Sequence, residues 1–363
     1  MSWNTELYVV SCKLSKGYSK SLELSEIEKY LKISPHGKSY DDYIKPNLFY
    51  FMENVKENVK EITKELSVDR VARKGLHIMG IYGGEKKKGK EQYAGITLLE
   101  YSYDNVKFEF RLWNTKDVLI IPIDLLRKYG IEIYKTIYRG DINPFRLRRF
   151  IDVILSNRGK NALKQFLQEV KEINANRIAH AETIKMIETL TNKIKQPGSL
   201  KTLNPKKYYV VYRRMRIFTA FAFKPTDNNI IASDTVSYIE CDEPKAYYYA
   251  AVLNYLAYKV VESSRSFIRD QFARPLLALY VVGLAWKDID ETVRNKVVEL
   301  SKVLHEKAPD RKYANQKVAL KDLATLLEFK ELVELLDSKV DKEALENALD
   351  MVSGKGIEEE KDE

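Results

Sequence analysis

The sequence predicts an α+β fold: an antiparallel-sheet domain comes first, a long helical spacer follows, and a domain in which strands precede helices comes last. Apolar and β-branched residues form four runs separated by turn residues, which indicate strands near 75–83, 93–103, 106–113 and 117–123. From residue 161 onward the apolar residues instead recur every three or four positions, which is typical of a helix. This change of period separates sheet from helix along the chain.

The first part of the chain predicts a strand at 6–14 and helices at 22–33 and 47–66. Together with the four strand-like runs, these elements form an N-terminal α+β domain over 1–157. The turn residues between the last three runs fit hairpin connections, so we expect antiparallel neighbours in the sheet.

A seam of apolar residues predicts one continuous helix over 161–195, and hence a long helical spacer at 158–195. Its members are spaced by three and four: Leu163, Phe166, Val170, Ile173, Ile184, Ile187 and Ile194. Arg177 and His180 fall in the middle of the seam. A polar interruption of this kind fixes the register of a packed helix or of a coiled coil, so we assign His180 to packing or register.

A linker at 196–207 follows, because Pro197 and Gly198 end the helical pattern. The domain after it covers 208–352 and precedes an acidic tail at 353–363. Its predicted elements are strands within 208–225 and 230–241 and helices near 246–262, 289–307, 319–337 and 341–352. Asp242, or the Glu243-Pro244 pair, is placed to open the first of these helices.

The composition permits a polyanionic partner and offers little for metal chemistry. The chain carries 61 Lys and Arg against 52 Asp and Glu, a net charge of +9. Two cysteines and four histidines, far apart in sequence, supply no zinc ligand set, so we expect no metal and no cofactor. No apolar run is long enough to span a bilayer and the start lacks the pattern of a signal peptide, so a cytoplasmic location without membrane contact is expected. The high Lys and Glu content resembles that of hyperthermophile proteins.

The segment from Gly84 to Lys90 has the glycine and lysine spacing of a phosphate-binding loop. However, Glu91 stands where such a loop needs a hydroxyl for magnesium, and strands are predicted on both sides where a helix should follow. We interpret the segment as a solvated hairpin tip that can contact nucleic-acid backbone. Four lysines would make that contact: Lys86, Lys87, Lys88 and Lys90.

A second basic group lies in the strand-like stretch from Tyr212 to Arg216. Side chains alternate in a strand, so Arg214 and Arg216 would share one face and Arg213 the other. Such arginines can bind phosphates or pair with guanine in the major groove. Alternatively, they are charges that protect an edge strand against aggregation. Flanking lysines support the nucleic-acid interpretation: Lys206, Lys207 and Lys224.

The sequence does not decide the role of two further groups of arginines. After Pro144 we expect a helix start that places Arg146 and Arg149 on one side and turns Arg148 away, beside the earlier Arg139. These residues fit phosphate positioning and a solvated helix face equally well. A third group could bind DNA or pair with nearby acids: Arg265, Arg269 and Arg274. The three successive tyrosines from Tyr247 are expected to pack rather than to stack on bases.

A resemblance appears over about 208–308. The predicted elements here are a basic strand pair, a further strand and two helices. The first helix contains Ala250-Ala251-Val252-Leu253-Asn254, and the second contains Val298-Glu299-Leu300-Ser301 and Leu304-His305. This order resembles that of target-recognition domains in N6-adenine DNA methyltransferases and in restriction-modification specificity subunits. Tyr255 departs from the serine usual in that family. No two prolines are adjacent in the chain, so the family's catalytic Asp/Asn-Pro-Pro-Tyr/Phe motif is absent.

The resemblance implies a DNA-binding protein, non-catalytic alone, whose methyltransferase or nuclease partner acts in trans in a restriction-modification or defence system. One alternative is a divergent metal-dependent nuclease of defence or repair. Asp104, Glu109 and Arg111 weakly match the D…E-x-R spacing of such a site, and Asp117 and Asp124 flank the next predicted strand. Another is a backbone-binding subunit of a nucleoprotein complex such as an RNA-guided effector. The choice between DNA and RNA and the oligomeric state stay open.

Overall fold

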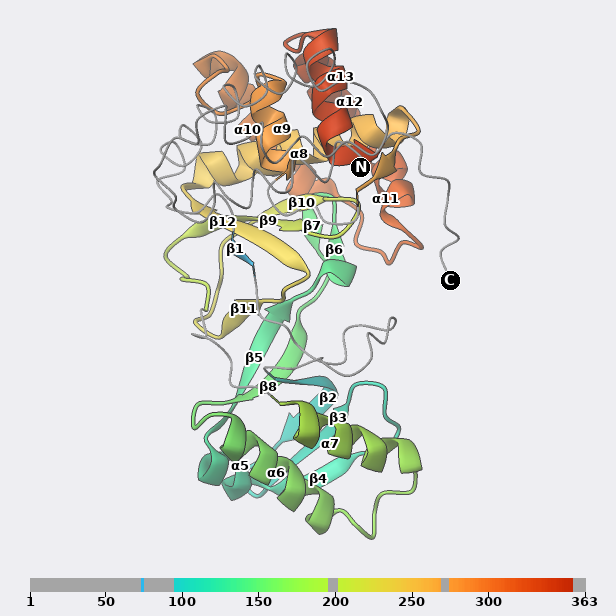
Figure 1. Cartoon of the computed structure of the whole chain (residues 1–363). Helices are drawn as coiled ribbons and strands as arrows, with labels where there is room; N and C mark the ends of the chain where they lie inside the picture. Colours follow the sequence, from blue (N-terminus) through green and yellow to red (C-terminus); the bar gives the residue numbers. More distant parts are fainter. Residues whose placement is uncertain (1–72, 75–94, 195–201, 269–273, 355–363) are drawn as a thin grey trace, which may run out of the picture. The chain divides into compact units, whose positions relative to one another are not determined.

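The computed structural model describes residues 73–74, 95–194, 202–268 and 274–354 (Figure 1). The chain divides into two compact units, 1–61 and 62–363, and every described residue belongs to the second. The described part is α+β with mostly antiparallel strands, as the sequence predicts. Several predicted elements lie outside the described residues, namely those at 6–14, 22–33, 47–66 and near 75–83.

A six-stranded sheet has the strand order β11-β5-β8-β2-β3-β4. Its strands are β2 (Ile96–Tyr103), β3 (Lys107–Leu112), β4 (Leu119–Pro122), β5 (Ile131–Ile137), β8 (Ile151–Ser156) and β11 (Ile230–Ala232). The strands predicted near 93–103, 106–113 and 117–123 are therefore confirmed. All neighbours in this sheet are antiparallel except β11, which comes from much later in the chain and pairs in parallel with β5.

Three helices accompany this sheet: α5 (Ile123–Tyr129), α6 (Lys160–Ile173) and α7 (Ala181–Lys193). Helix α6 contacts both α7 and β4 (Figure 1). Residues alternate between buried and more exposed along β3, and the buried Phe110 lies 6.5 Å, ring to ring, from Phe166 of α6. One face of β3 and the apolar stripe of α6 thus share a core.

The continuous helix expected over 161–195 is wrong, because the chain leaves the helix after Ile173 and resumes it at Ala181. Asn174 is fully buried, and its side-chain amide donates to the carbonyls of Val170 and Ile120 while accepting from the N–H of Ile120. These bonds tie the end of α6 to β4. The assignment of 158–195 as one spacer between domains remains a prediction about domain organisation.

The second sheet has the order β1-β12-β9-β10, with all neighbours antiparallel. Its strands are β1 (Arg73–Lys74), β9 (Tyr208–Arg213), β10 (Ala220–Phe223) and β12 (Val236–Cys241). Helix α8 (Glu243–Glu262) packs on β9 and β10. Asp242 caps α8 by accepting from the N–H of Lys245, and Pro244 stands in the first turn, so the predicted helix start is confirmed.

Helix α8 is buried on nearly all sides and forms the centre of the largest core. The helices in this part are α9 (Arg274–Val281), α10 (Glu291–Lys307), α11 (Gln316–Leu323), α12 (Leu327–Asp337) and α13 (Lys342–Val352) (Figure 1). The stretch expected as one helix near 319–337 is two, α11 and α12. Tyr248 and Tyr249 are buried in the core, so the packing role expected for the tyrosine run is confirmed for both.

The helix expected after Pro144 is wrong. A short helical turn, η1 (Arg139–Asp141), leads into a hairpin of β6 (Ile142–Asn143) and β7 (Arg146–Leu147). Phe145 has a φ of +60° and a buried ring that lies 5.2 Å from the ring of His305. Proline suits the second position of a tight turn as well as the first turn of a helix. Burial of the Phe145 ring favours the turn over the helix.

Three residues that carry the resemblance hold the second sheet to its helices. Asn254 of α8 accepts from the N–H of Ala220 at 2.9 Å and donates to its carbonyl at 2.8 Å. Ser301 donates to the carbonyl of Tyr247. The Nε2 atom of His305 accepts from the N–H of Ala222, so Nδ1 carries the proton and donates to the carbonyl of Ser301. Asn254 and His305 thus fix the position of β10, and Ser301 ties α10 to α8, so all three are determinants of the fold.

Replacing Asn254 by leucine should destabilise the chain by about 1–3 kcal/mol, because the buried N–H of Ala220 loses its acceptor, while the Ala220 carbonyl keeps only the N–H of Phe145 as a donor. Chemical denaturation measures this change. Tyr258→Phe, which removes an exposed hydrogen bond to Glu262, is the control and should cost less than about 0.5 kcal/mol. Similar values for the two variants would contradict the role given to Asn254.

Stability should fall between about pH 6.5 and pH 4 because of His305. Burial lowers the pKa of His305 to about 4, against the opposing effect of its bond to Ser301, so only the unfolded chain gains a proton in this window. The group can contribute up to about 1.4 kcal/mol per pH unit. Thermal melting from pH 7 to pH 4.5 should show a shallower loss for His305→Gln than for His180→Gln. An equal loss in both variants would assign the pH dependence to other groups.

Candidate nucleic-acid interface

The turn between β11 and β12 joins two arginine-bearing segments that are far apart in sequence. The N–H of Ser233 donates to the carbonyl of Ile137, and the N–H of Arg139 donates to the hydroxyl of Thr235. The carbonyl of Thr235 accepts from the N–H of Arg214 at 3.0 Å. The end of β5 and the end of β9 therefore meet at one turn.

Two further arginines reach the same neighbourhood through Asp141. This buried carboxylate accepts from Arg149 at 2.9 Å and from Arg148 at 3.3 Å. Burial raises the pKa of Tyr138; among nearby charges Arg139 and Arg213 lower it and Asp141 raises it, so these groups share one electrostatic environment. We call this set the arginine cluster: Arg139, Arg148, Arg149, Arg213 and Arg214.

Two aspartates stand in or beside the arginine cluster among the residues that the structure describes. Asp141 holds two of the guanidinium groups. Asp234 lies at the joining turn, where its backbone carbonyl is 3.5 Å from Nη1 of Arg214. Two of the basic groups predicted from the sequence, the one after Pro144 and the one in Tyr212 to Arg216, are brought together here.

Arg213 is partly exposed as a residue, but part of its guanidinium group is buried. It stands opposite Val236 at the end of β9, and its Nε atom is buried without a hydrogen-bond acceptor. Burial, with the charge of Arg139 beside it, lowers the pKa of Arg213 to about 9. The guanidinium therefore remains protonated at neutral pH.

The expected strand from Tyr212 to Arg216 is wrong in its second half, because β9 ends at Arg213. The N–H of Arg213 donates to the carbonyl of Thr219, which closes a loop before β10 begins. Arg216 lies exposed in that loop with a φ of +56°. Arg214 and Arg216 consequently do not share a strand face.

Arg146 has a structural role. Its guanidinium donates to the carbonyl of Ala308 at 3.0 Å and to the carboxylate of Asp310 at 3.1 Å. The hairpin of β6 and β7 is thereby tied to the segment that follows α10. Arg146 does not join Arg148 and Arg149 on Asp141.

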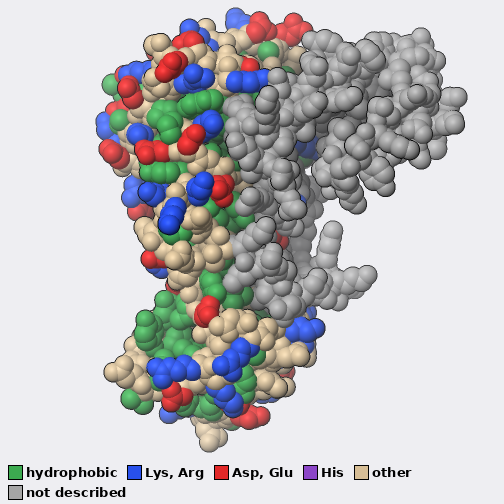
Figure 2. Space-filling view, turned by 90° about the vertical axis from the view of Figure 1, so that its left-hand side faces the viewer, with side chains coloured by type: hydrophobic (Ala, Val, Ile, Leu, Met, Phe, Trp, Pro, Cys, Tyr) green, Lys and Arg blue, Asp and Glu red, His purple; other side chains and the backbone are tan. Residues whose placement is uncertain are grey.

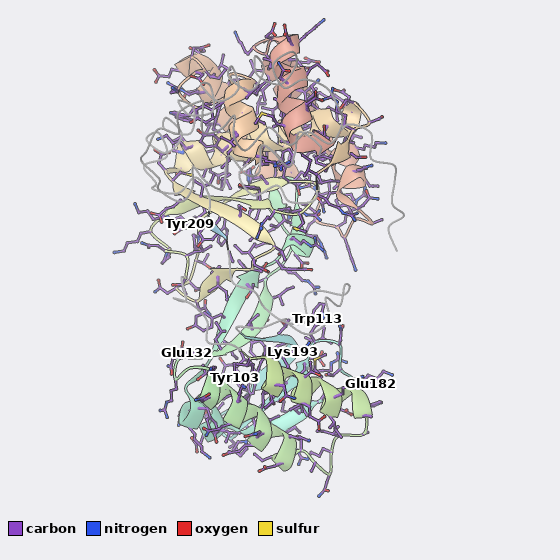
Figure 3. The ribbon with its side chains drawn as sticks, in the orientation of Figure 1. Tyr103, Trp113, Glu132, Glu182, Lys193 and Tyr209 are labelled. Carbon is purple, nitrogen blue, oxygen red and sulfur yellow. The ribbon has the colours of Figure 1, made fainter. Side chains whose placement is uncertain are left out.

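The predicted lysines lie at the other end of β9. Lys206 and Lys207 precede the strand, and Lys224 lies 5.2 Å from the ring of Tyr208. Figure 3 labels Tyr209 in this strand. Acidic side chains are interleaved with these lysines: Lys207 is 3.8 Å from Glu240, and nearby Lys302 is 2.7 Å from Glu243. Acidic partners therefore accompany the lysines at this end of the sheet.

The remaining predicted residues lie elsewhere. Arg265 pairs with Glu346 and Asp350 of α13, as its alternative interpretation expected. Arg274 begins α9. Five predicted residues lie outside the described part: Lys86, Lys87, Lys88, Lys90 and Arg269. On the face in Figure 2, Lys and Arg side chains are interspersed with Asp and Glu over the helical part.

The acids considered for a nuclease have structural partners. Asp104 accepts from the N–H groups of Val106 and Lys107 in the turn between β2 and β3. Glu109 pairs with Lys107, and Arg111 lies 3.0 Å from Glu100 on the neighbouring strand. Within the described ranges, no three His, Cys, Asp or Glu side chains gather as a metal site needs.

Sequence reasoning missed a contact between Asp117 and His180. Asp117 is buried and accepts from Nδ1 of His180 at 2.8 Å, from the hydroxyl of Thr183, and from the N–H groups of Ala179 and His180. Burial alone would raise the pKa of Asp117, but these hydrogen bonds outweigh it and lower the pKa to about 2. Asp117 thus caps α7 from the neighbouring loop, and His180 lies at the helix start rather than in a seam.

Comparison with solved structures gives a distant likeness. No family model matches the chain, and no curated protein matches it. A solved structure, described as the type IIL restriction-modification enzyme MmeI in complex with DNA, aligns with 65% of this chain and 30% of its own at a TM-score of 0.32 and 17% identity. The chain therefore spans less than a third of that protein. Among the helices described, none is long and apolar enough to cross a membrane.

Replacing Asp117 by alanine should destabilise the chain by about 1–3 kcal/mol, because buried donors at the start of α7 lose their acceptor. The pKa of the folded state lies below its ordinary value, so this stabilisation is present above about pH 4 and is lost as the pH falls toward 2. Denaturation at pH 7 measures the loss. Asp124→Ala, at a highly exposed carboxylate on α5, is the matched control; equal losses would show that the Asp117 bonds are not stabilising.

Proposed function

We propose that this chain binds duplex DNA through the arginine cluster and acts as a target-recognition unit without catalytic activity of its own. A separate methyltransferase or nuclease, within a restriction-modification or defence system, would act on the DNA. The observation that carries the proposal is the convergence of the cluster around Thr235 and Asp141.

The chemistry of guanidinium groups supports a phosphate-bearing partner. Each guanidinium has five N–H donors in a planar fork, which matches the oxygens of a phosphate. In the arginine cluster, a bound phosphate would add acceptors beside the carboxylate of Asp141, which Arg148 and Arg149 contact. Arg149 has a side chain that is 56% exposed, which lets a ligand reach it.

Base recognition would come from the loop that follows β9. Arg216 is exposed at its centre, and an arginine at a loop tip can enter the major groove and pair with guanine. The loop is closed at its base by the bond between Arg213 and Thr219, and its flanking strands are held to α8 by Asn254. A rigid base of this kind would present a side chain in one orientation.

Changing Arg149 and Arg216 together to alanine should weaken binding to a 20-base-pair duplex and reduce the slope of log K against log salt by about two. Fluorescence anisotropy over a series of salt concentrations measures both quantities. The matched control changes two exposed cations elsewhere, Arg127 on α5 and Lys330 on α12, to alanine. The control should retain the wild-type slope within about 0.5.

Equal effects of the two double variants would show that only net charge matters and would contradict a site at the arginine cluster. Selection from a random duplex pool then tests recognition, because a target reader prefers its best sequence over random duplex by several kcal/mol. Strong binding to DNA and RNA with no enrichment would instead support the backbone-binding subunit.

A further inference from the structure

A β-bulge in β2 turns the tyrosines at the end of this strand toward the core face of the six-stranded sheet. The pairing of β2 with β3 shifts by one residue between Leu98 and Glu100, so Leu99 is the extra residue. Leu98 is buried in the core that α6 covers, and after the bulge Tyr101 stands opposite the buried Phe110 and packs against the same core. Without the bulge, Glu100 would face the core instead. Bulges re-aim side chains in this way beside functional sites.

The two tyrosines present aromatic surface at the margin of this core. Tyr103 is 67% exposed (Figure 3). Its ring is parallel to that of Tyr101 within 2°, at 6.4 Å between centres, which is the spacing of alternate residues on one face of a strand. Tyr101 is half-buried, and its ring lies 6.0 Å from that of the buried Phe108. The core thus holds Tyr101 in place beside an exposed ring.

A carboxylate without a partner lies on the same face of the sheet. Asp152 of β8 stands directly opposite Lys135 of β5, and Ile154, two residues further along β8, is buried in the core. Lys135 donates to Asp227 at 3.1 Å, and Asp152 forms no hydrogen bond or ion pair with any residue that the structure describes. Burial raises the pKa of Asp152, and the charge of Lys135 opposes that rise. A half-buried carboxylate without a donor costs the free protein stability.

Strand pairing brings this carboxylate toward the tyrosines. Thr97 of β2 pairs with Val153 of β8, and from there β2 runs antiparallel past Asp152 toward Tyr101. Burial raises the pKa of Tyr101 most, and the carboxylate of Asp152 raises it further, as expected of groups at one margin of the core. An aromatic surface and a hydrogen-bond acceptor therefore stand together.

Strand β8 also connects this margin to the arginine cluster. Asp152 follows Arg149 by three residues, which span no more than about 11 Å. The side chain of Arg149 is 56% exposed. Successive nucleotides are about 3.4 Å apart along a strand of duplex DNA, so about three of them cover this distance. A DNA strand with a phosphate at Arg149 would therefore have neighbouring bases within reach of Asp152.

We propose that Tyr101, Tyr103 and Asp152 bind one unpaired nucleobase that carries an exocyclic amino group. The inference rests on the proposed function, because the base belongs to DNA held at the arginine cluster. Any base can stack on an exposed aromatic ring. The carboxylate would accept a hydrogen bond from the amino group of cytosine, whereas thymine has no such group. A base inside an intact duplex is stacked on both sides, so the site takes a base only outside the stack.

A nucleobase fits these surroundings better than a cationic side chain of a protein partner. Either would suit a carboxylate beside aromatic rings. However, Arg148 and Arg149 precede Asp152 closely, and the chain as a whole carries a net charge of +9. Positive charge of this kind attracts a polyanion and repels a cationic peptide. The charge around the site therefore favours nucleic acid.

Three 20-base-pair duplexes test the inference on the whole chain: one is fully paired, one has a single extrahelical cytosine and one a single extrahelical thymine. In fluorescence anisotropy, the cytosine duplex should bind at least about fivefold more tightly than the paired duplex, and more tightly than the thymine duplex. Tyr103→Ala should abolish the gain from the unpaired base while changing the affinity for paired duplex less than about twofold. Asp152→Leu should bind the cytosine and thymine duplexes alike, because it removes the acceptor but leaves the rings.

Leu327→Ala is the matched control for Tyr103→Ala, because Leu327 of α12 is similarly exposed, at 65%. It should keep the preference for unpaired cytosine in full. Tyr103→Ala and Asp152→Leu should melt within about 3 °C of the wild type, since neither side chain is fully buried. The inference is overturned if the wild-type chain binds the three duplexes alike, or if Tyr103→Ala and Leu327→Ala show the same preference.

A single-stranded arm separates this inference from the proposed function. Binding of paired duplex without any preference for an unpaired base overturns the inference and leaves the proposed function intact. Binding of a short oligodeoxycytidine but not of duplex, weakened at least about fivefold by Tyr103→Ala, would uphold the base site and refute duplex recognition. Binding of neither refutes both. An arginine-rich peptide that binds only when Tyr103 is present, without preference for an unpaired base, would assign the surface to a protein partner and overturn the inference.

Discussion

The parallel pairing of β11 with β5 is the constraint on which the candidate interface depends. It places the turn after β11 beside the end of β5, so that Thr235 can bond to Arg139 through its hydroxyl and to Arg214 through its carbonyl. Arg139 and Thr235 are 96 residues apart. Without this pairing, the two arginine segments would be separate basic stretches on different sheets.

Electrostatics and packing act in opposite directions at this turn. The core beneath it is apolar, and its members include Ile137 and Val236. Arg213 ends β9 at the edge of that core, and burial of its guanidinium lowers its pKa. Functional sites often break a local rule of packing or charge. The C-terminal core, centred on α8, supplies the rigidity that such a site requires.

The sequence predicts well those elements whose determinants are local. Helix α8 begins where Asp242 and Pro244 indicate, and β2, β3 and β4 follow the runs of apolar and β-branched residues that turn residues separate. The helix predicted after Pro144 was wrong because proline suits both a helix start and a tight turn. The choice between the two depends on where the ring of Phe145 can be buried. Local pattern cannot decide that question.

The break after α6 and the arginine cluster lay beyond sequence reasoning for a related reason. Asn174 ends its helix by bonding to Ile120, 54 residues away, and the apolar period on either side of it continues undisturbed. The individual arginines of the cluster were identifiable as basic residues. Their convergence was not, because it follows from a strand pairing between distant segments.

Hydrogen–deuterium exchange of the whole chain, with and without a short DNA duplex, tests the central claim most directly. The account predicts that DNA slows exchange together in three segments: 138–149, 213–217 and 233–235. Protection confined to the lysine-bearing ends of β9 and β10, or no protection in these three segments under conditions where DNA is bound, would contradict the claim that the arginine cluster is the binding site.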